Sequence, residues 1–270
     1  MGKLLINAEN AEFQIIESLK NNRVKRNNSR EIFIEGIESI KQILKAGVEI
    51  TRIITADITS SWAENIIKNQ ESIGTKTIRM NDALYRKLCD RTDPSEMLVT
   101  AKMPRPALGD IRLPGLPFIL VLDRPSDAGN LGSIIRSADS FGADAVLVIG
   151  HGVDPWDPKT IRASLGSVFF TVPVHLDSFG ELEDFVLSLK DRCGLKILGT
   201  DSKGSISLAS EFPKRPLMLI IGNEAKGMSR SMETLCDQIV SIPLSGSVNS
   251  LNVASAASIF MWEVYKNSVV

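Results

Sequence analysis

Short runs of apolar residues recur in the second half of this 270-residue chain and limit the folds that it can adopt. Phe118–Leu122, Ala145–Ile149 and Leu217–Ile221 are apolar throughout, and Leu195–Leu198 is interrupted only by a lysine. A strand that is buried on both faces shows such a run, whereas a strand with one solvated face alternates. Helical patterns separate the runs. The second half is therefore expected to be an α/β fold, a mainly parallel sheet with helices on both faces.

The first half alternates in the same way over about a hundred residues, which suits a separate small domain. Residues 8–20 predict a helix, because Phe13, Ile16 and Leu19 form one apolar stripe. A polar, basic stretch follows at residues 21–30. Beyond it we expect strands at residues 31–34, 50–55, 75–79 and 97–102, and helices at residues 37–45, 61–68 and 82–89.

Prolines and glycines concentrate between the two halves, at residues 104–117. Such a composition is typical of a linker. The predicted organisation is a smaller N-terminal α/β domain at 1–103, a linker at 104–117 and a second domain at 118–270. In the second domain we expect a short strand at 239–242 and helices at residues 132–141, 159–165, 181–192, 229–235 and 251–266.

The composition excludes several classes of protein. With 43% hydrophobic and 23% charged residues the chain is typical of globular proteins, and its net charge of −1 gives no overall positive field. Three scattered cysteines and two histidines suit neither a disulfide framework nor a metal centre. No apolar run is long enough to span a membrane. We therefore expect a soluble, cytoplasmic protein without a metal.

Three polar, glycine-bearing segments follow the predicted strands. They are 130–136, which runs from Asn130 to Arg136, then 222–227, and finally Ile242-Pro243 with 250–253. Because open α/β sheets bind ligands beyond the carboxyl ends of their strands, these segments are expected to converge on one site. The chain lacks the glycine patterns of a P-loop and of a Rossmann dinucleotide site. Ser164 also lacks the surroundings of a hydrolase nucleophile.

Each segment taken alone has an ordinary structural interpretation. Asn130 and Ser250 suit helix N-caps, and Glu224 suits a cap for the helix expected near residue 229. Glu224 is equally suited to fixing a loop by accepting backbone N–H bonds. Arg136, at the end of the first helical turn, is either a surface charge or a bidentate ligand for a phosphate. These alternatives stay open on the residues alone.

Together and in this order, the segments resemble the signature motifs of the SpoU/TrmH family of RNA ribose 2′-O-methyltransferases, within the SPOUT superfamily. Residues 162–166, ahead of Phe169 and Pro173, also follow the family pattern, and the resemblance spans 118–265. It implies a deep C-terminal trefoil knot, bound S-adenosylmethionine and a homodimer whose site draws on both subunits. Residues 1–103, through residues 33–36, resemble the ribosomal-protein-like RNA-binding domain of many members.

The resemblance also implies site residues. The implied catalytic residues are Asn130, Arg136, Glu224, Ser250 and Asn252. Those implied to hold the cofactor, largely through backbone groups, are Leu198, Gly199, Thr200, Gly222, Ile242 and Leu251. Basic residues suited to RNA phosphates are Arg23, Lys25, Arg26, Arg30, Arg52 and Arg162, although a solvated basic stretch explains most of them equally well.

The role of Arg136 has a physical constraint. An arginine guanidinium loses its proton only above pH ~12, and keeping one neutral near pH 7 costs about 7 kcal/mol. We therefore favour a clamp on the target phosphate that stabilises a developing alkoxide over a general base. The expected substrate is large-subunit ribosomal RNA. The alternatives are a transfer-RNA ribose 2′-O-methyltransferase and an inactive RNA-binding or ribosome-assembly protein.

Overall fold

The structure is a computed structural model that describes residues 4–56, 60–90, 93–209 and 212–269. Its contacts divide the chain into two compact units. The first contains Met1–Pro104 and Trp156–Phe169, and the second contains Arg105–Pro155 and Phe170–Val270. The boundaries expected from the sequence placed residues 156–169 with the second domain, whereas the contacts group this segment with the first hundred residues.

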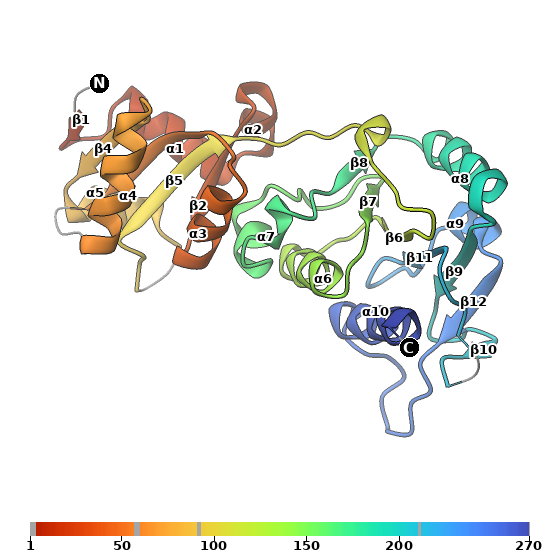
Figure 1. Cartoon of the computed structure of the whole chain (residues 1–270). Coiled ribbons are helices and arrows are strands. Elements are labelled where there is room, and N and C mark those ends of the chain that lie inside the picture. The colour runs from red at the N-terminus through yellow and green to blue at the C-terminus, as the bar shows by residue number, and fades with distance from the viewer. Residues whose placement is uncertain (1–3, 57–59, 91–92, 210–211, 270) are drawn as a thin grey trace. The chain divides into compact units, whose positions relative to one another are not determined.

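The first unit holds a five-stranded mixed sheet in the order β1-β4-β3-β5-β2 (Figure 1). The strands β1, β4 and β3 run parallel, and β5 lies antiparallel to β3 and β2. The bounds are β1 Leu4–Ile6, β2 Glu31–Glu35, β3 Ile50–Thr55, β4 Lys76–Met80 and β5 Met97–Lys102. The sequence predicted four of these strands and missed the three-residue β1.

Four helices in the described part of the first unit, α1, α2, α4 and α5, begin at asparagine or serine caps. Asn10, Asn22, Ser60 and Asn81 each accept a backbone N–H through the side chain, which satisfies one free donor of the first turn. The expected apolar stripe of the first helix is buried in the core. The bounds are α1 Ala11–Asn21, α2 Arg23–Ser29, α3 Ile37–Lys45, α4 Ser61–Ser72, α5 Asp82–Leu88, α7 Pro158–Ala163 and the 3₁₀ helix η2 Ser167–Phe169.

Helix α2 corrects the interpretation of residues 21–30 as a plain basic stretch. Asn22 caps the helix, and Arg26 turns inward until its side chain is 2% exposed. The Arg26 guanidinium donates to the carbonyl oxygens of Leu19 and Lys20 and pairs with Asp157 at 3.3 Å. A buried arginine with carbonyl and carboxylate partners satisfies its donors, which composition alone does not reveal.

The second unit holds a seven-stranded sheet in the order β10-β12-β9-β11-β6-β7-β8. All neighbouring strands run parallel, as the apolar runs predicted. Two very short strands, β8 and β10, were not expected. The bounds are β6 Phe118–Asp123, β7 Ala145–Ile149, β8 Val174–Leu176, β9 Lys196–Thr200, β10 Ile206–Ser207, β11 Leu217–Ile221 and β12 Gln238–Ser241.

Helices cover both faces of this sheet, with α8 and α9 on one side and α6 and α10 on the other (Figure 1). Ile119 and Val121 of β6 pack in the core formed with α8 and α9, so the alternate residue Leu120 faces the opposite layer. The bounds are α6 Ala128–Ser140, α8 Phe179–Cys193, α9 Arg230–Leu235, α10 Val253–Val269 and the 3₁₀ helix η1 Leu108–Asp110.

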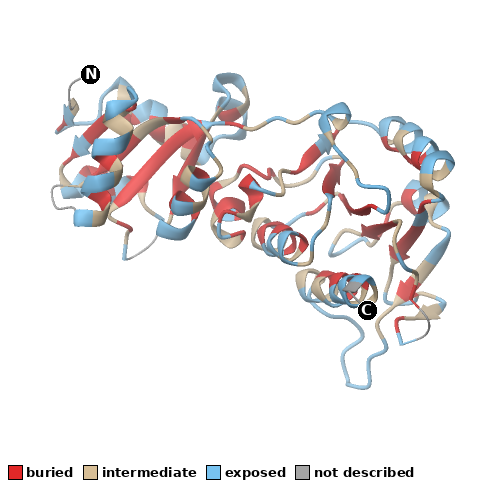
Figure 2. Cartoon of the chain, viewed as in Figure 1, coloured by how far each residue is buried: buried red, intermediate tan, exposed pale blue. Residues whose placement is uncertain are grey.

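Burial follows this layering. Figure 2 shows buried residues along the central strands of both sheets and exposed residues along the loop between β12 and α10. Residues 243–252, in that loop, are all exposed. Their polar side chains are therefore available to line a site at the carboxyl edge of the parallel sheet. No helix in the described part of the chain is long and apolar enough to cross a membrane.

Candidate active site

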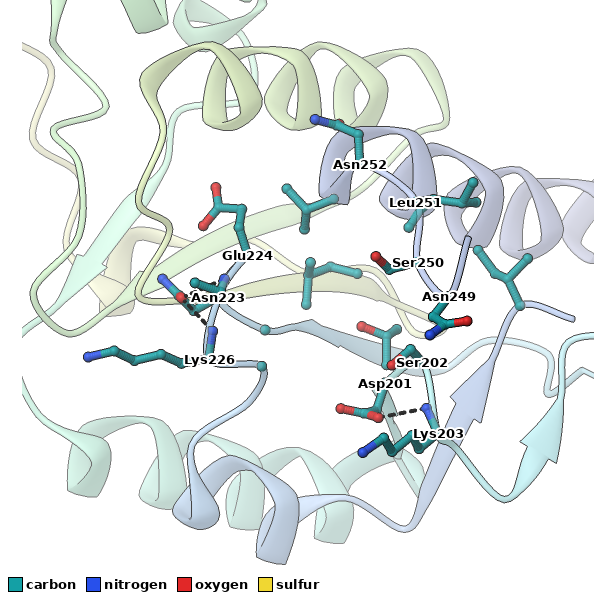
Figure 3. Close-up of a pocket in the computed structure, with 18 of the residues that line it drawn as sticks. Asp201, Ser202, Lys203, Asn223, Glu224, Lys226, Asn249, Ser250, Leu251 and Asn252 are labelled. Carbon is teal, nitrogen blue, oxygen red and sulfur yellow. Dashed lines mark hydrogen bonds between the residues drawn. The ribbon is translucent and has the colours of Figure 1, made fainter. Parts of the chain in front are cut away.

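The carboxyl ends of β9, β11 and β12 open into one cleft of about 580 Å³ in the second unit. Figure 3 shows three labelled groups around it, on the loops that follow these strands. The first is Asp201–Lys203, the second is Asn223, Glu224 and Lys226, and the third is 249–252. The cleft is also lined by Asn130, Thr200, Ile221, Gly222, Ala225, Gly227, Ile242, Leu244, Val253, Ala256 and Phe260. Asn130 of the first predicted polar segment, residues 222–227 of the second, and Ile242 with residues 250–253 of the third therefore line the same cleft.

A tight turn after β11 presents Glu224 to the cleft. The backbones of Asn223 and Gly227 exchange two hydrogen bonds of 3.0 and 2.9 Å, and Asn223 Oδ1 accepts the N–H groups of the two residues after Glu224. Gly222 admits no side chain, because a Cβ there would lie 2.4 Å from the backbone nitrogen of Met228. Gly222 is thus required for the close return of the chain, and Gly227 adopts the left-handed backbone with a φ of 67° that glycine favours.

Glu224 ties this turn to the loop before α6. Its carboxylate accepts the N–H of Ser126 at 3.0 Å and that of Asp127 at 3.3 Å, together with the Ser126 hydroxyl. Burial raises the pKa of Glu224, but the hydrogen bonds from Ser126, from backbone N–H groups and from the Asn130 amide lower it, and the net pKa lies below the usual value. Of the two structural interpretations, loop fixation is confirmed, and a cap on α9 is wrong.

A directed chain of side-chain hydrogen bonds continues from Glu224. Asn252 Oδ1 accepts the N–H groups of Ala254 at 2.9 Å and Ser255 at 3.3 Å, so its amide nitrogen must point away from α10. That nitrogen donates to Asn130 Oδ1 at 3.0 Å, which leaves Asn130 Nδ2 to donate to Glu224 at 3.3 Å. The backbone of α10 therefore sets the orientation of both amides.

Two expected helix caps are displaced by two or three residues. Asp127, rather than Asn130, is the N-cap of α6, and its carboxylate accepts the N–H of Asn130 at 2.8 Å. Asn252, rather than Ser250, caps α10 through the bonds described above. In both helices the cap leaves an asparagine or serine of the predicted site facing the cleft. Asp127 could have been predicted from the sequence, because aspartate is a favoured N-cap and lies three residues before Asn130.

Comparison with known proteins agrees with this geometry. A model described as the SpoU rRNA Methylase family matches residues 117–262, and one described as the SpoU L30e-like domain matches residues 10–100. This chain belongs to the SpoU rRNA methylase family. The resemblance of its three motifs to that family is confirmed.

Relatives within the family match nearly the whole chain. The 23S rRNA (uridine(2479)-2′-O)-methyltransferase of Streptomyces viridochromogenes is 34% identical over 98% of this chain and 92% of its own length. The 23S rRNA (guanosine(2553)-2′-O)-methyltransferase RlmP of Bacillus subtilis is 29% identical over 92% of this chain and 98% of its own length. The crystal structure of the SpoU methyltransferase AviRb from S. viridochromogenes in complex with AdoMet has a TM-score of 0.86 at 34% identity, over 95% of this chain and 98% of that one.

The six residues that the resemblance implied as cofactor ligands divide into two sets in this structure. Thr200, Gly222, Ile242 and Leu251 line the cleft. Leu198 and Gly199 precede Thr200 in β9 and do not line the cleft: Leu198 is 1% exposed, and a Cβ on Gly199 would lie 2.6 Å from Cys236 Sγ. The lining also contains Asp201, Lys203 and Lys226, which the sequence analysis did not select, since nothing local distinguishes them from surface charges.

Arg136 is the predicted catalytic residue that does not line this cleft. It lies exposed on α6, about one and a half turns beyond Asn130. Within the described residues, no carboxylate lies within 4.0 Å of its guanidinium. Its charge is therefore available to a partner outside the described contacts.

The predicted RNA-contacting residues also differ in their surroundings. Arg23, Lys25 and Arg30 are exposed on or beside α2. Arg26 is buried, as described above, and Arg52 pairs with Glu12 at 2.6 Å and Glu31 at 2.7 Å. Arg162 lies in α7 with its guanidinium 3.0 Å from Glu35 and 3.5 Å from Asp90. Carboxylate partners within the first unit are therefore described for Arg26, Arg52 and Arg162. Across the described ranges, no group of three histidine, cysteine or acidic residues could hold a metal ion.

Proposed function

We propose that this chain binds S-adenosylmethionine in the cleft and methylates a ribose 2′-hydroxyl of large-subunit ribosomal RNA in the cytoplasm. The observation that carries the proposal is the hydrogen-bonded series Asn252–Asn130–Glu224, which joins the three family motifs at one wall of the cleft. Family membership supports it, as do relatives whose names specify 2′-O-methylation of 23S rRNA.

The cleft suits the cofactor in size and in the kind of groups that it presents. Its 580 Å³ falls within the range of ~300–1,000 Å³ usual for small-molecule sites. Gly222 exposes bare backbone there, and Thr200, Ile242 and Leu251 supply further backbone groups and apolar contact. Leu198 and Gly199 hold the end of β9, from which Thr200 reaches the cleft. Bound S-adenosylmethionine supplies a methyl group on a positively charged sulfur, and the carboxylates of Asp201 and Glu224 favour a cation nearby.

Methyl transfer to a ribose oxygen requires in-line alignment of the oxygen with the methyl group. Asn130 and Asn252 are held rigidly by the bonds that fix their amides, and Ser250 lies in the same lining. These side chains position the ribose, while Glu224 anchors the turn that presents Gly222 to the cofactor. The proton of the 2′-hydroxyl leaves to solvent, because an arginine guanidinium is a poor general base near neutral pH.

Arg136 acts as a clamp on the target phosphate and stabilises the developing alkoxide. Because it does not line the cleft of its own chain, the copy that serves this cleft comes from the partner of a homodimer. The exposed side chains Ile259, Trp262 and Tyr265 of α10, with Phe141 packed 6.0 Å from both aromatic rings, support such a dimer. An exposed apolar patch of this kind is usual where subunits associate.

The family relationship carries two further proposals about architecture. The loops that follow β9, β11 and β12 are threaded as a deep trefoil knot, a rare exception to the rule against knotted chains. Residues 1–103 form the RNA-binding domain, residues 104–117 the linker, and residues 118–270 the catalytic domain. The match of residues 10–100 to the SpoU L30e-like domain supports this division.

Exposed cations near α2 position the RNA through its phosphates. Lys25 and Arg30 are the clearest candidates, with Arg23 beside them. Arg162 can contact a phosphate only if its ion pairs with Glu35 and Asp90 break. Replacing Lys25 and Arg30 with alanine is expected to lower the salt dependence of RNA binding by about 0.7 in log–log slope per lost phosphate contact. An unchanged slope would count against contacts there.

Calorimetric titration with S-adenosylmethionine tests the proposed activity against an inactive assembly protein. We expect saturable binding at one site per chain. Gly222→Val should weaken it, because the new side chain would collide with the backbone nitrogen of Met228 and displace the turn. Absence of binding by the intact protein would instead favour an RNA-binding role without catalysis. Methylation of transfer RNA in place of ribosomal RNA would contradict the substrate class alone.

A further inference from the structure

A buried carboxylate at the end of β6 contacts the chain just after the turn that carries Glu224. Asp123 is 2% exposed and accepts two hydrogen bonds from the neighbouring Arg124 guanidinium, at 2.8 and 3.0 Å. It also accepts the backbone N–H of Ser229 at 2.6 Å. Ser229 is the residue before α9, so Asp123 fixes the point where the turn ends and the helix begins.

Arg124 holds the same turn at two further points. Its backbone oxygen accepts Asn223 Nδ2 at 2.7 Å, at the start of the turn, and its guanidinium reaches the carbonyl oxygen of Gly227 at 3.4 Å, at the end. Asp123 and Arg124 together therefore contact Asn223, Gly227 and Ser229. These contacts are distinct from those of Glu224, whose own partners are Ser126 and Asp127.

The backbone at Arg124 is held in an unfavourable conformation. Its φ of 53° lies in the left-handed region, which a residue with a side chain rarely adopts outside sites where the surroundings enforce it. Its N–H donates to the carbonyl oxygen of Ile149 at 3.0 Å. On the other side, a Cβ on Gly150 would lie 2.9 Å from Arg124 Cγ, so only glycine leaves room for this side chain.

We propose that Asp123 and Arg124 are positioning residues for the cofactor site, which act by holding the Asn223–Gly227 turn in the shape that presents Gly222 and Glu224 to the cleft. Neither residue lines the cleft, so neither is a catalytic residue. The proposal rests on the proposed function, since it assigns these residues to the binding of S-adenosylmethionine. Loss of the Arg124 guanidinium removes the contact to Gly227 and leaves the Asp123 carboxylate, which accepts the N–H of Ser229, without its cationic partner, whereas the bond from Asn223 to the Arg124 backbone oxygen does not involve that side chain.

Two substitutions test this role in the full-length protein. Arg124→Lys keeps a cation beside the buried Asp123 but removes the planar fork that makes two bonds at once. Arg124→Ala removes the guanidinium altogether. Because hydrogen bonds of charged groups are involved, we expect the dissociation constant for S-adenosylmethionine to rise about 10- to 100-fold in Arg124→Ala and less in Arg124→Lys. Hydrogen exchange at the backbone of residues 223–229 is expected to accelerate in both.

A second aspartate–arginine pair at the opposite end of β6 provides the matched control. Asp144 accepts the N–H of Phe118 at 2.7 Å and lies 3.4 Å from the Arg215 guanidinium. Arg215→Ala is expected to lower the melting temperature without changing cofactor affinity or exchange at residues 223–229. This control separates a general loss of stability from a specific displacement of the turn at residues 223–227.

The outcomes separate failure of this inference from failure of the proposed function. If the unaltered protein binds S-adenosylmethionine and folded Arg124→Lys and Arg124→Ala bind it equally well, the positioning role is wrong. If Arg124→Ala does not fold, the test rests on Arg124→Lys. Cofactor affinity and hydrogen exchange in that variant that match the unaltered protein would also show that the positioning role is wrong. If the unaltered protein does not bind the cofactor, the proposed function fails, and acceleration of exchange in residues 223–229 still decides whether the pair holds the turn.

Discussion

Glu224 joins two segments that lie almost a hundred residues apart, and its chemistry could be predicted only in part. The sequence indicated a carboxylate that fixes a loop, because a glycine lies on each side of it. It gave no means of choosing Ser126 and Asp127 as the partners, since that choice depends on how β6 and β11 pair in the sheet. The identity of a site residue was therefore predictable where its contacts were not.

The lowered pKa of Glu224 predicts a pH-dependent contribution to stability. A carboxyl whose pKa is lower in the folded than in the unfolded protein stabilises the fold above the unfolded value near 4.5, and the contribution is lost as the pH falls through the folded value. Glu224→Gln should therefore melt at a lower temperature than the unaltered protein at pH 7, and the difference should narrow below pH 4.5.

Glu183→Gln is the matched control, since Glu183 is exposed on α8. Its melting temperature should follow that of the unaltered protein at both pH values. A difference for Glu224→Gln that stays constant down to pH 3 would show that its hydrogen bonds do not favour the ionised form.

Arg136 provides a test of the clamp at the same scale. Arg136→Lys keeps the charge but loses the planar fork, so we expect turnover on RNA to fall by about 100-fold with cofactor affinity unchanged. Single-turnover methylation measures this. Arg230→Lys, on the exposed face of α9, is the control for a general arginine effect. Turnover near that of the unaltered protein with unchanged RNA affinity would contradict the clamp.

At the scale of elements, the apolar runs predicted β7 and β11 with the bounds that the structure has, because each wholly apolar run is too short for a buried helix and suits a strand that is buried on both faces. Helix α2 was missed because its seven residues are mostly polar and its one buried side chain is an arginine. The start of α10 was displaced because several serines and asparagines before it suit a cap equally well. Only the packed structure selects Asn252.

The cap of α10 yields a prediction that separates stability from activity. Asn252→Ala removes both the cap and the bond to Asn130, so we expect a loss of about 1 kcal/mol in unfolding free energy together with reduced turnover. Asn252→Asp keeps an acceptor for the cap but has no amide donor for Asn130. It should retain its unfolding free energy in denaturant and still lose turnover. If the two variants lose unfolding free energy and turnover to the same extent, the cap and the bond to Asn130 do not have separate roles.

At the scale of the whole molecule, the sequence predicted two α/β units but not the grouping of Trp156–Phe169 with the first. Contacts such as that of Arg162 with Glu35 join residues 127 positions apart, and no local pattern indicates them. Arg162 therefore appeared in the sequence as a candidate for phosphate, whereas the structure surrounds it with acidic partners.

The proposed homodimer is a property of the whole molecule with a simple test. Trp262 is 48% exposed on α10, beside Tyr265 and Phe141. Placing a charge in a buried apolar interface is costly, so Trp262→Glu is expected to shift the protein from dimer to monomer in light scattering and to lower turnover. Leu187→Glu, at an exposed position of α8, should leave the mass unchanged. A monomeric unaltered protein would contradict the shared site.

The most direct test is to map ribose methylation after incubating the purified protein with S-adenosylmethionine and unmodified ribosomal RNA. The account predicts a 2′-O-methyl group at a defined nucleotide of the large-subunit RNA, absent when Asn130→Ala replaces the unaltered protein. No ribose methylation by a protein that binds the cofactor, or methyl groups found on bases instead of ribose, would contradict it.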